Sequence, residues 1–225
     1  MFFDPIYLLF IAPGLFLSLI ATILLNRWNK TYSQKHNLNH ISGSELVARI
    51  CQSENIDIHL SVADTELSNS YNSYDHRLTL SRDVAYETTI SAVAIAAHEL
   101  GHAMQHKQKS PLIIIRNFIV PAVNIVTQLG YLLIILGFVI STLKISEIGL
   151  ILFSLSTVFI LLTVPIELDA SKKALILLKG EQILYPDEIG GAKKVLAAAA
   201  LTYIASLVQS IGQVLYFFFR IKDRD

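Results

Sequence analysis

The sequence predicts a mainly α-helical membrane protein with about four transmembrane helices and a small α+β domain between the first and the second. Three observations support this fold class. Apolar residues make up 53% of the chain, and the mean hydropathy of +0.52 is high for a soluble domain of 225 residues. Long uncharged runs are long enough to cross a bilayer as helices. A single long polar region interrupts these runs near the amino-terminal end.

The first predicted span occupies residues 6–26, which carry no charge over a length sufficient to cross the hydrocarbon core. A cleaved signal peptide is the alternative. Asp4 rather than a basic residue precedes the run, and no small-x-small cleavage site lies before Arg27. We therefore expect residues 1–26 to be a retained transmembrane anchor.

Three further uncharged runs occupy residues 117–143, 148–166 and 195–219. The first two are joined by a short polar connection, so they predict a transmembrane hairpin over residues 117–166. The third run contains small and polar residues, among them Ser206 and Gln209, which favour packing against other helices. We predict a fourth transmembrane helix and a tail in residues 195–225.

The polar region, residues 27–116, is near the lower end of the length at which a chain folds as one domain. Ser42 followed by Glu45 forms a capping-box pattern and predicts a short amphipathic helix. Residues 56–60 and 77–81 alternate apolar with polar side chains and predict strands of a small sheet. The segment between them, residues 68–76, is rich in turn-forming residues.

A helix is predicted to follow, with Thr88 or Thr89 as its cap. This helix carries His98, Glu99 and His102 in an H-E-x-x-H pattern. Two histidines four residues apart lie on one face of a helix, so both imidazoles can bind one Zn²⁺ ion. The intervening Glu99 is positioned as a general base for a water molecule at the metal.

A catalytic zinc site usually has a third protein ligand, so another residue is needed. His106 lies one turn farther along the same helix, about six ångströms along the axis, too far to bind the same ion easily. Glu167 follows the third uncharged run, and a hairpin returns the chain there to the membrane face of the polar domain. We therefore predict Glu167, in a segment covering residues 167–194, as the third ligand.

Several motifs together resemble the bacterial YugP-like family of neutral zinc metallopeptidases, which are multi-pass membrane proteins. These motifs are AHELGHAMQ at 97–105, LTLS at 78–81, VPIELDAS at 164–171, GAKKVL at 191–196 and LTY at 201–203. The resemblance implies a zincin-like domain with a gluzincin site, in which a second helix supplies the glutamate, here Glu167. Related membrane proteases usually have an acidic residue where this chain has Ser171, so Ser171 and Asp169 are alternative partners for a zinc histidine.

These residues predict a membrane-bound zinc metalloendopeptidase whose substrate is a peptide or protein and whose general base is Glu99. We expect residues 77–81 to form an edge strand before the catalytic helix, and we expect the substrate to extend along this strand through main-chain pairing. Three tyrosines, Tyr71, Tyr74 and Tyr203, are alternative donors to the oxyanion. The competing interpretation is a non-enzymatic membrane scaffold or channel component with a structural zinc site, although such sites usually have four protein ligands.

Charge and cysteine content narrow the partners and the location. Lys plus Arg and Asp plus Glu both total 18, which gives no electrostatic reason to expect nucleic acid as a partner. The single cysteine, Cys51, excludes an internal disulfide and is compatible with a reducing compartment. The uncharged runs predict a multi-pass protein of the cell membrane, with the lipid bilayer as a partner. Most Lys and Arg residues lie on the same side of the membrane as the polar domain, and cations are retained in the cytoplasm, so we expect the active site to face the cytoplasm.

Overall fold

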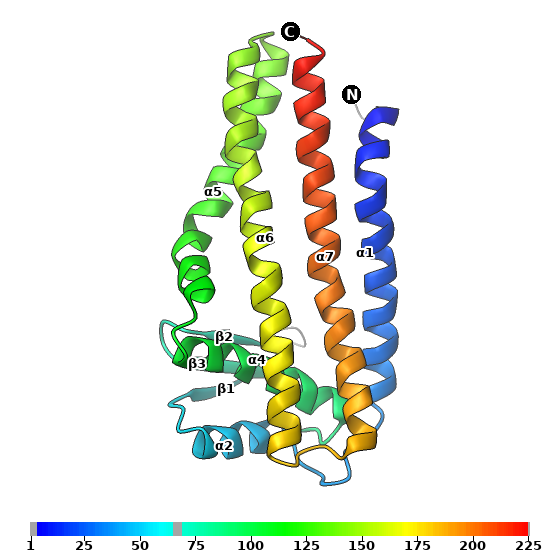
Figure 1. Ribbon diagram of the computed structural model, residues 1–225, viewed down its shortest axis with the longest axis vertical. Coiled ribbons are helices and arrows are strands. Elements are labelled where there is room, and N and C mark those ends of the chain that lie inside the picture. Colours follow the sequence, from blue (N-terminus) through cyan, green and yellow to red (C-terminus); the bar gives the residue numbers. More distant parts are fainter. Residues whose placement is uncertain (1–3, 65–68, 225) are drawn as a thin grey trace. The chain divides into compact units, whose positions relative to one another are not determined.

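The computed structural model describes residues 4–64 and 69–224, and this part of the chain is mostly helical (Figure 1). In chain order the elements are α1 (Pro5–Tyr32), α2 (Gly43–Ser53), β1 (His59–Ala63), β2 (Ser70–Asn72), β3 (Arg77–Ser81), α3 (Arg82–Tyr86), α4 (Ile90–Lys107), α5 (Pro111–Val139), α6 (Leu143–Gly180) and α7 (Pro186–Lys222). The prediction of a mainly α-helical chain with a small sheet is confirmed.

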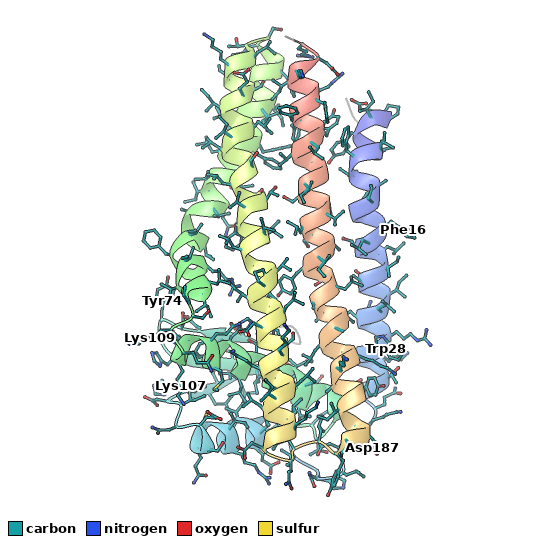
Figure 2. The ribbon with its side chains drawn as sticks, in the orientation of Figure 1. Phe16, Trp28, Tyr74, Lys107, Lys109 and Asp187 are labelled. Carbon is teal, nitrogen blue, oxygen red and sulfur yellow. The ribbon has the colours of Figure 1, made fainter. Side chains whose placement is uncertain are left out.

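Four helices in the described residues are long and apolar enough to cross a membrane: α1, α5 over Ala122–Val139, α6 and α7. Each of them overlaps one of the predicted spans. Large apolar side chains on them are exposed, including Leu9 and Phe16 on α1 and Ile151 on α6, and Figure 2 labels Phe16 on the outer side of α1. Exposed apolar surface of this kind is expected where a helix contacts lipid.

The helices α1, α6 and α7 extend beyond the uncharged runs that predicted them, whereas α5 ends at Val139, before the end of its run. We expected Glu167 to lie in a segment after the third span, but α6 continues through Pro165 to Gly180, so Glu167 is inside the helix. The continuation buries one face, which includes Ile166, Ala170 and Ala174 at helical spacing. An uncharged run marks the apolar part of a helix and not its end.

The chain divides into two compact units. One contains Met1–Ala21, Ile114–Pro165 and Leu201–Asp225, and the other contains Thr22–Ile113 and Ile166–Ala200. The H-E-x-x-H motif and Glu167 both belong to the second unit. The division into five sequence segments at 26, 116, 166 and 194 stays a prediction.

In the first unit, polar and aromatic side chains join the long helices. Tyr216 on α7 donates a hydrogen bond to the Asp4 carboxylate (2.9 Å), and its ring contacts Tyr7 on α1 at a centroid distance of 4.9 Å. The hydroxyls of Thr157 on α6 and Ser210 on α7 are hydrogen-bonded. These contacts agree with the expectation that the polar residues of the fourth run pack against other helices.

In the second unit, the sheet has the order β1-β3-β2, with β1 parallel and β2 antiparallel to β3. Leu78 and Leu80 on β3 are fully buried and belong to one apolar core with Leu46 of α2 and Leu100 of α4. The prediction that a substrate pairs with residues 77–81 is wrong. That strand is β3, whose two edges are already occupied by β1 and β2.

The local signals for α2 and α4 are confirmed. Ser42 and Glu45 form a complete capping box, with each side chain bonded to the backbone of the other residue. Thr89, rather than Thr88, caps α4 by accepting a hydrogen bond from the backbone N–H of Ala92 (3.2 Å). These caps fix the residues at which α2 and α4 begin.

Candidate metal centre

The middle turns of the helix α4 are almost completely buried, and many of their side chains are alanines. Ala94, Ala96 and Ala97 are fully buried, and Leu100 follows them in the same core. Small side chains allow neighbouring backbones to approach closely, so the position of this helix is determined by packing on several sides. A metal site on such a helix is held rigidly.

Gly101 brings α4 against the part of α6 that carries Glu167. A Cβ atom at position 101 would lie only 2.4 Å from the backbone oxygen of Ala170, so no larger residue fits without moving a helix. Figure 1 shows α4 crossing the carboxyl-terminal part of α6 at this level. The glycine between the motif's Glu99 and His102 therefore sets the distance across which the side chains meet.

Three side chains converge at this crossing. The Oε2 atom of Glu167 lies 3.2 Å from Nε2 of His98 and 3.4 Å from Nε2 of His102. One ligand atom from each of the three residues lies within 4.8 Å of the other two. Two imidazoles and one carboxylate are a donor set typical of catalytic zinc, and the convergence of their ligand atoms fits that ion.

Glu99 lies beside this group and is only 8% exposed. Burial raises the pKa of its carboxyl group, while the neighbouring His102 and His98 oppose that shift. The backbone amide of Tyr71 on β2 lies close enough to lower the pKa of Glu99, against the larger effect of burial. Glu99 therefore lies between the metal ligands and the strand β2.

Gln105 fixes the orientation of the second histidine. Its side-chain nitrogen donates to the backbone oxygen of Ile166 and to the Asp169 carboxylate, both at 2.8 Å. The amide oxygen is then left to accept from Nδ1–H of His102 at 3.1 Å. The proton of His102 is therefore on Nδ1, and the Nε2 lone pair faces the site.

The first histidine has a different partner. The Ser171 hydroxyl lies 3.2 Å from Nδ1 of His98 and can accept a hydrogen bond from Nδ1–H. The lone pair of His98 is then on Nε2, the nitrogen that faces Glu167. The two alternatives left open by the sequence thus both take part. Ser171 contacts His98 directly, whereas Asp169 reaches His102 only through Gln105.

The remaining sequence candidates lie elsewhere. His106 is not in the three-residue group, and its Nδ1 is hydrogen-bonded to the Tyr71 hydroxyl at 3.0 Å. Burial, followed by the neighbouring His76, lowers the pKa of His106. Tyr74 is 76% exposed, and Tyr203 belongs to the other compact unit. The backbone of Tyr71, one of the three candidate tyrosines, lies next to Glu99.

Comparison with known proteins identifies the family of this chain. The model of a family described as "Putative neutral zinc metallopeptidase" matches residues 7–222. The chain belongs to this family. A relative from Bacillus subtilis (strain 168), the "Putative membrane protease YugP", is 33% identical over 187 residues, covering 83% of this chain and 83% of the relative. No solved structure gives a significant match.

Membership of the zinc metallopeptidase family confirms the resemblance seen in the sequence. The family description implies zinc as the metal. The relative's name and the four apolar helices together indicate a multi-pass membrane protein. The last residue of the AHELGHAMQ motif is Gln105, and the structure gives it a role, because its side chain is hydrogen-bonded to His102.

Sequence reasoning missed Gln105 and β2 in this protein. Gln105 lies three residues after His102, on a neighbouring position of the helix surface, and this spacing was the available signal. Its two acceptors come from α6, which is distant in sequence. The short strand β2 lies in the segment interpreted as turns, and its pairing with β3 required the tertiary structure.

Proposed function

We propose that this chain is a membrane-bound zinc-dependent endopeptidase that hydrolyses peptide bonds with Glu99 as the general base. The observation that carries the proposal is the convergence of His98, His102 and Glu167, from two helices, around one point beside Glu99. Three protein ligands are the number typical of catalytic zinc, whereas structural sites usually have four. This ligand number disfavours the scaffold alternative.

Zinc bound by these residues would polarise the scissile carbonyl and lower the pKa of a water molecule. Glu99 accepts the proton of that water as its oxygen attacks the carbonyl carbon. Glu99 then delivers the same proton to the amide nitrogen as the C–N bond breaks. Gln105 and Ser171 hold the two imidazoles in the tautomer that binds metal throughout.

The substrate would extend along β2. Within the described residues β2 pairs only with β3, and the backbone amide of Tyr71 on β2 lies beside Glu99. A peptide added to the edge of β2 opposite β3 would pass the general base, and main-chain pairing would hold it with little demand on its side chains. This location replaces the predicted pairing with residues 77–81.

The proposal is tested by two substitutions that separate chemistry from metal binding. Glu99→Gln preserves shape but cannot accept the proton, so we expect zinc content near that of wild type with peptidase activity lowered at least a hundredfold. Glu167→Ala removes a ligand, so we expect loss of zinc and activity together. Metal analysis and cleavage of an unstructured protein substrate measure both outcomes.

The matched control is His106→Ala on the same helix, which should keep its zinc because His106 bonds to Tyr71 instead of the metal group. Full peptidase activity in Glu99→Gln would overturn the general-base role. Loss of zinc in His106→Ala but not in Glu167→Ala would overturn the ligand assignment.

A further inference from the structure

A cluster of cations and aromatic rings surrounds Trp28 in the second compact unit. The guanidinium carbon of Arg27 lies 5.3 Å from the Trp28 ring centroid, and the ammonium of Lys194 lies 4.7 Å from the same ring. Figure 2 labels Trp28 on α1, close to the beginning of α7. Two segments far apart in sequence therefore place positive charge on one indole.

The packing of α1 on α7 builds this cluster. A Cβ atom at Gly191 would lie 2.5 Å from the Tyr32 ring, so the glycine lets Tyr32 lie directly on α7. Tyr32 is one turn from Trp28, with ring centroids 6.1 Å apart, and Lys35 lies 5.5 Å from the Tyr32 ring. Each aromatic ring thus holds a cation at a defined position.

The aromatic rings of the cluster are in contact with three cations. They are Arg27 and Lys194 at Trp28 and Lys35 at Tyr32, and all three are exposed. In the described part of the chain, no salt bridge joins any of them to a carboxylate. A cation above a ring face uses its charge and not its N–H groups, so these groups can still bind an anion.

The cluster lies at the membrane edge of two spans. Trp28 follows the uncharged run 6–26, and Lys194 directly precedes the run 195–219. Tryptophan prefers the level of the lipid headgroups, and cations flanking a span reach the phosphates. Ile23, one turn before Arg27, is 55% exposed and offers apolar surface next to the cations.

We propose that the cluster around Trp28 is a binding site for an anionic phospholipid, with the phosphate held by the cations and the acyl chains against α1. Charge complementarity selects an anionic over a zwitterionic headgroup. The adjacent apolar helix selects a phospholipid over free phosphate, because only a lipid occupies both surfaces. This site is separate from the metal centre and does not depend on peptidase activity.

Trp28 is the only tryptophan in the chain, so its fluorescence reports on this site alone. The full-length protein is reconstituted into phosphatidylcholine vesicles that contain a small fraction of either brominated phosphatidylglycerol or brominated phosphatidylcholine. We expect the brominated anionic lipid to quench Trp28 more strongly at equal mole fraction. Equal quenching by the two lipids would overturn the proposal.

The variant Lys35→Gln/Lys194→Gln removes two of the cations at nearly constant size. We expect the preference for the anionic lipid to fall about fivefold for each lysine removed. The control variant Lys172→Gln/Lys179→Gln changes two other exposed lysines of the second unit and should keep the preference. Zinc content equal to wild type shows that both variants are folded.

A last experiment asks whether inorganic phosphate, at tens of millimolar, competes with the lipid for the site. Potassium chloride at equal ionic strength is its control. We expect phosphate to reduce quenching no more than the chloride does. Abolition of the lipid preference by phosphate alone would identify a free-anion site and contradict the lipid assignment. An unchanged preference in Lys35→Gln/Lys194→Gln would contradict it as well.

Discussion

At the scale of single residues, Gln105 determines which nitrogen of His102 is available to a metal. A carboxylate in this position could accept from His102, but it could not donate to the Ile166 backbone oxygen and would face the Asp169 carboxylate. The amide satisfies all three partners at once. With only 1% of its surface exposed, Gln105 has no water to replace any of them.

Replacing Gln105 should therefore weaken metal binding without touching a ligand. We expect Gln105→Ala to lower zinc affinity by about tenfold to a hundredfold, because His102 loses the partner that fixes its tautomer. Gln105→Glu should not restore it. Zinc affinity is measured by competition with a chelator, and the control is Gln108→Ala at the exposed end of α4. Wild-type affinity in Gln105→Ala would contradict this role.

The sequence predicted the four central residues of the candidate site because their chemistry is visible in their spacing and type. His98, Glu99 and His102 lie within two helical turns, and the structure brings Glu167 to them. Their roles stay predictions. Gln105 and Ser171 escaped a definite assignment because a hydrogen bond between α4 and α6 depends on the separation of the helices, which Gly101 sets.

At the scale of elements, local signals were reliable and boundaries were not. The capping residues Ser42 and Thr89 mark the starts of two helices, since a cap acts on its own backbone. The first strand was predicted at residues 56–60 and lies at His59–Ala63. Alternating polarity already begins at Ile56, before that strand, so only the pairing with β3 fixes where the strand begins.

The contact between α4 and α6 can be tested through Gly101. We expect Gly101→Ala to destabilise the fold by about 1–3 kcal/mol, because the new Cβ atom overlaps the Ala170 backbone. The separated helices should also bind zinc more weakly. Thermal unfolding in detergent and metal analysis measure the two effects.

The matched control is Gly190→Ala on α7, where an added Cβ atom meets nothing within 4 Å. There we expect a gain of about 0.5–1 kcal/mol, because alanine favours a helix more than glycine does. A Gly101→Ala variant that is as stable as wild type, with full zinc content, would show that the helices do not require this close approach.

At the scale of the whole molecule, the distribution of cations along the chain predicts its orientation in the membrane. Nine Lys and Arg residues lie in 27–116 and five in 167–194, whereas 144–147 contains one. The first two segments share one side if the first three apolar runs all cross the bilayer. Cations are retained in the cytoplasm, which favours a cytoplasmic metal centre. The three cations after residue 219 oppose this bias if the fourth run also crosses.

Cysteine labelling in intact cells tests this orientation in a Cys51→Ser background. The exposed positions Gln52 and Glu181 represent the side of the metal centre, and exposed Glu147 represents the hairpin connection. We expect an impermeant maleimide to label a cysteine at 147 and to leave cysteines at 52 and 181 unlabelled until the membrane is permeabilised. Labelling of 52 and 181 from outside, with 147 protected, would place the metal centre on the external face. The cysteine-free protein controls for background, and zinc content confirms that each variant is folded.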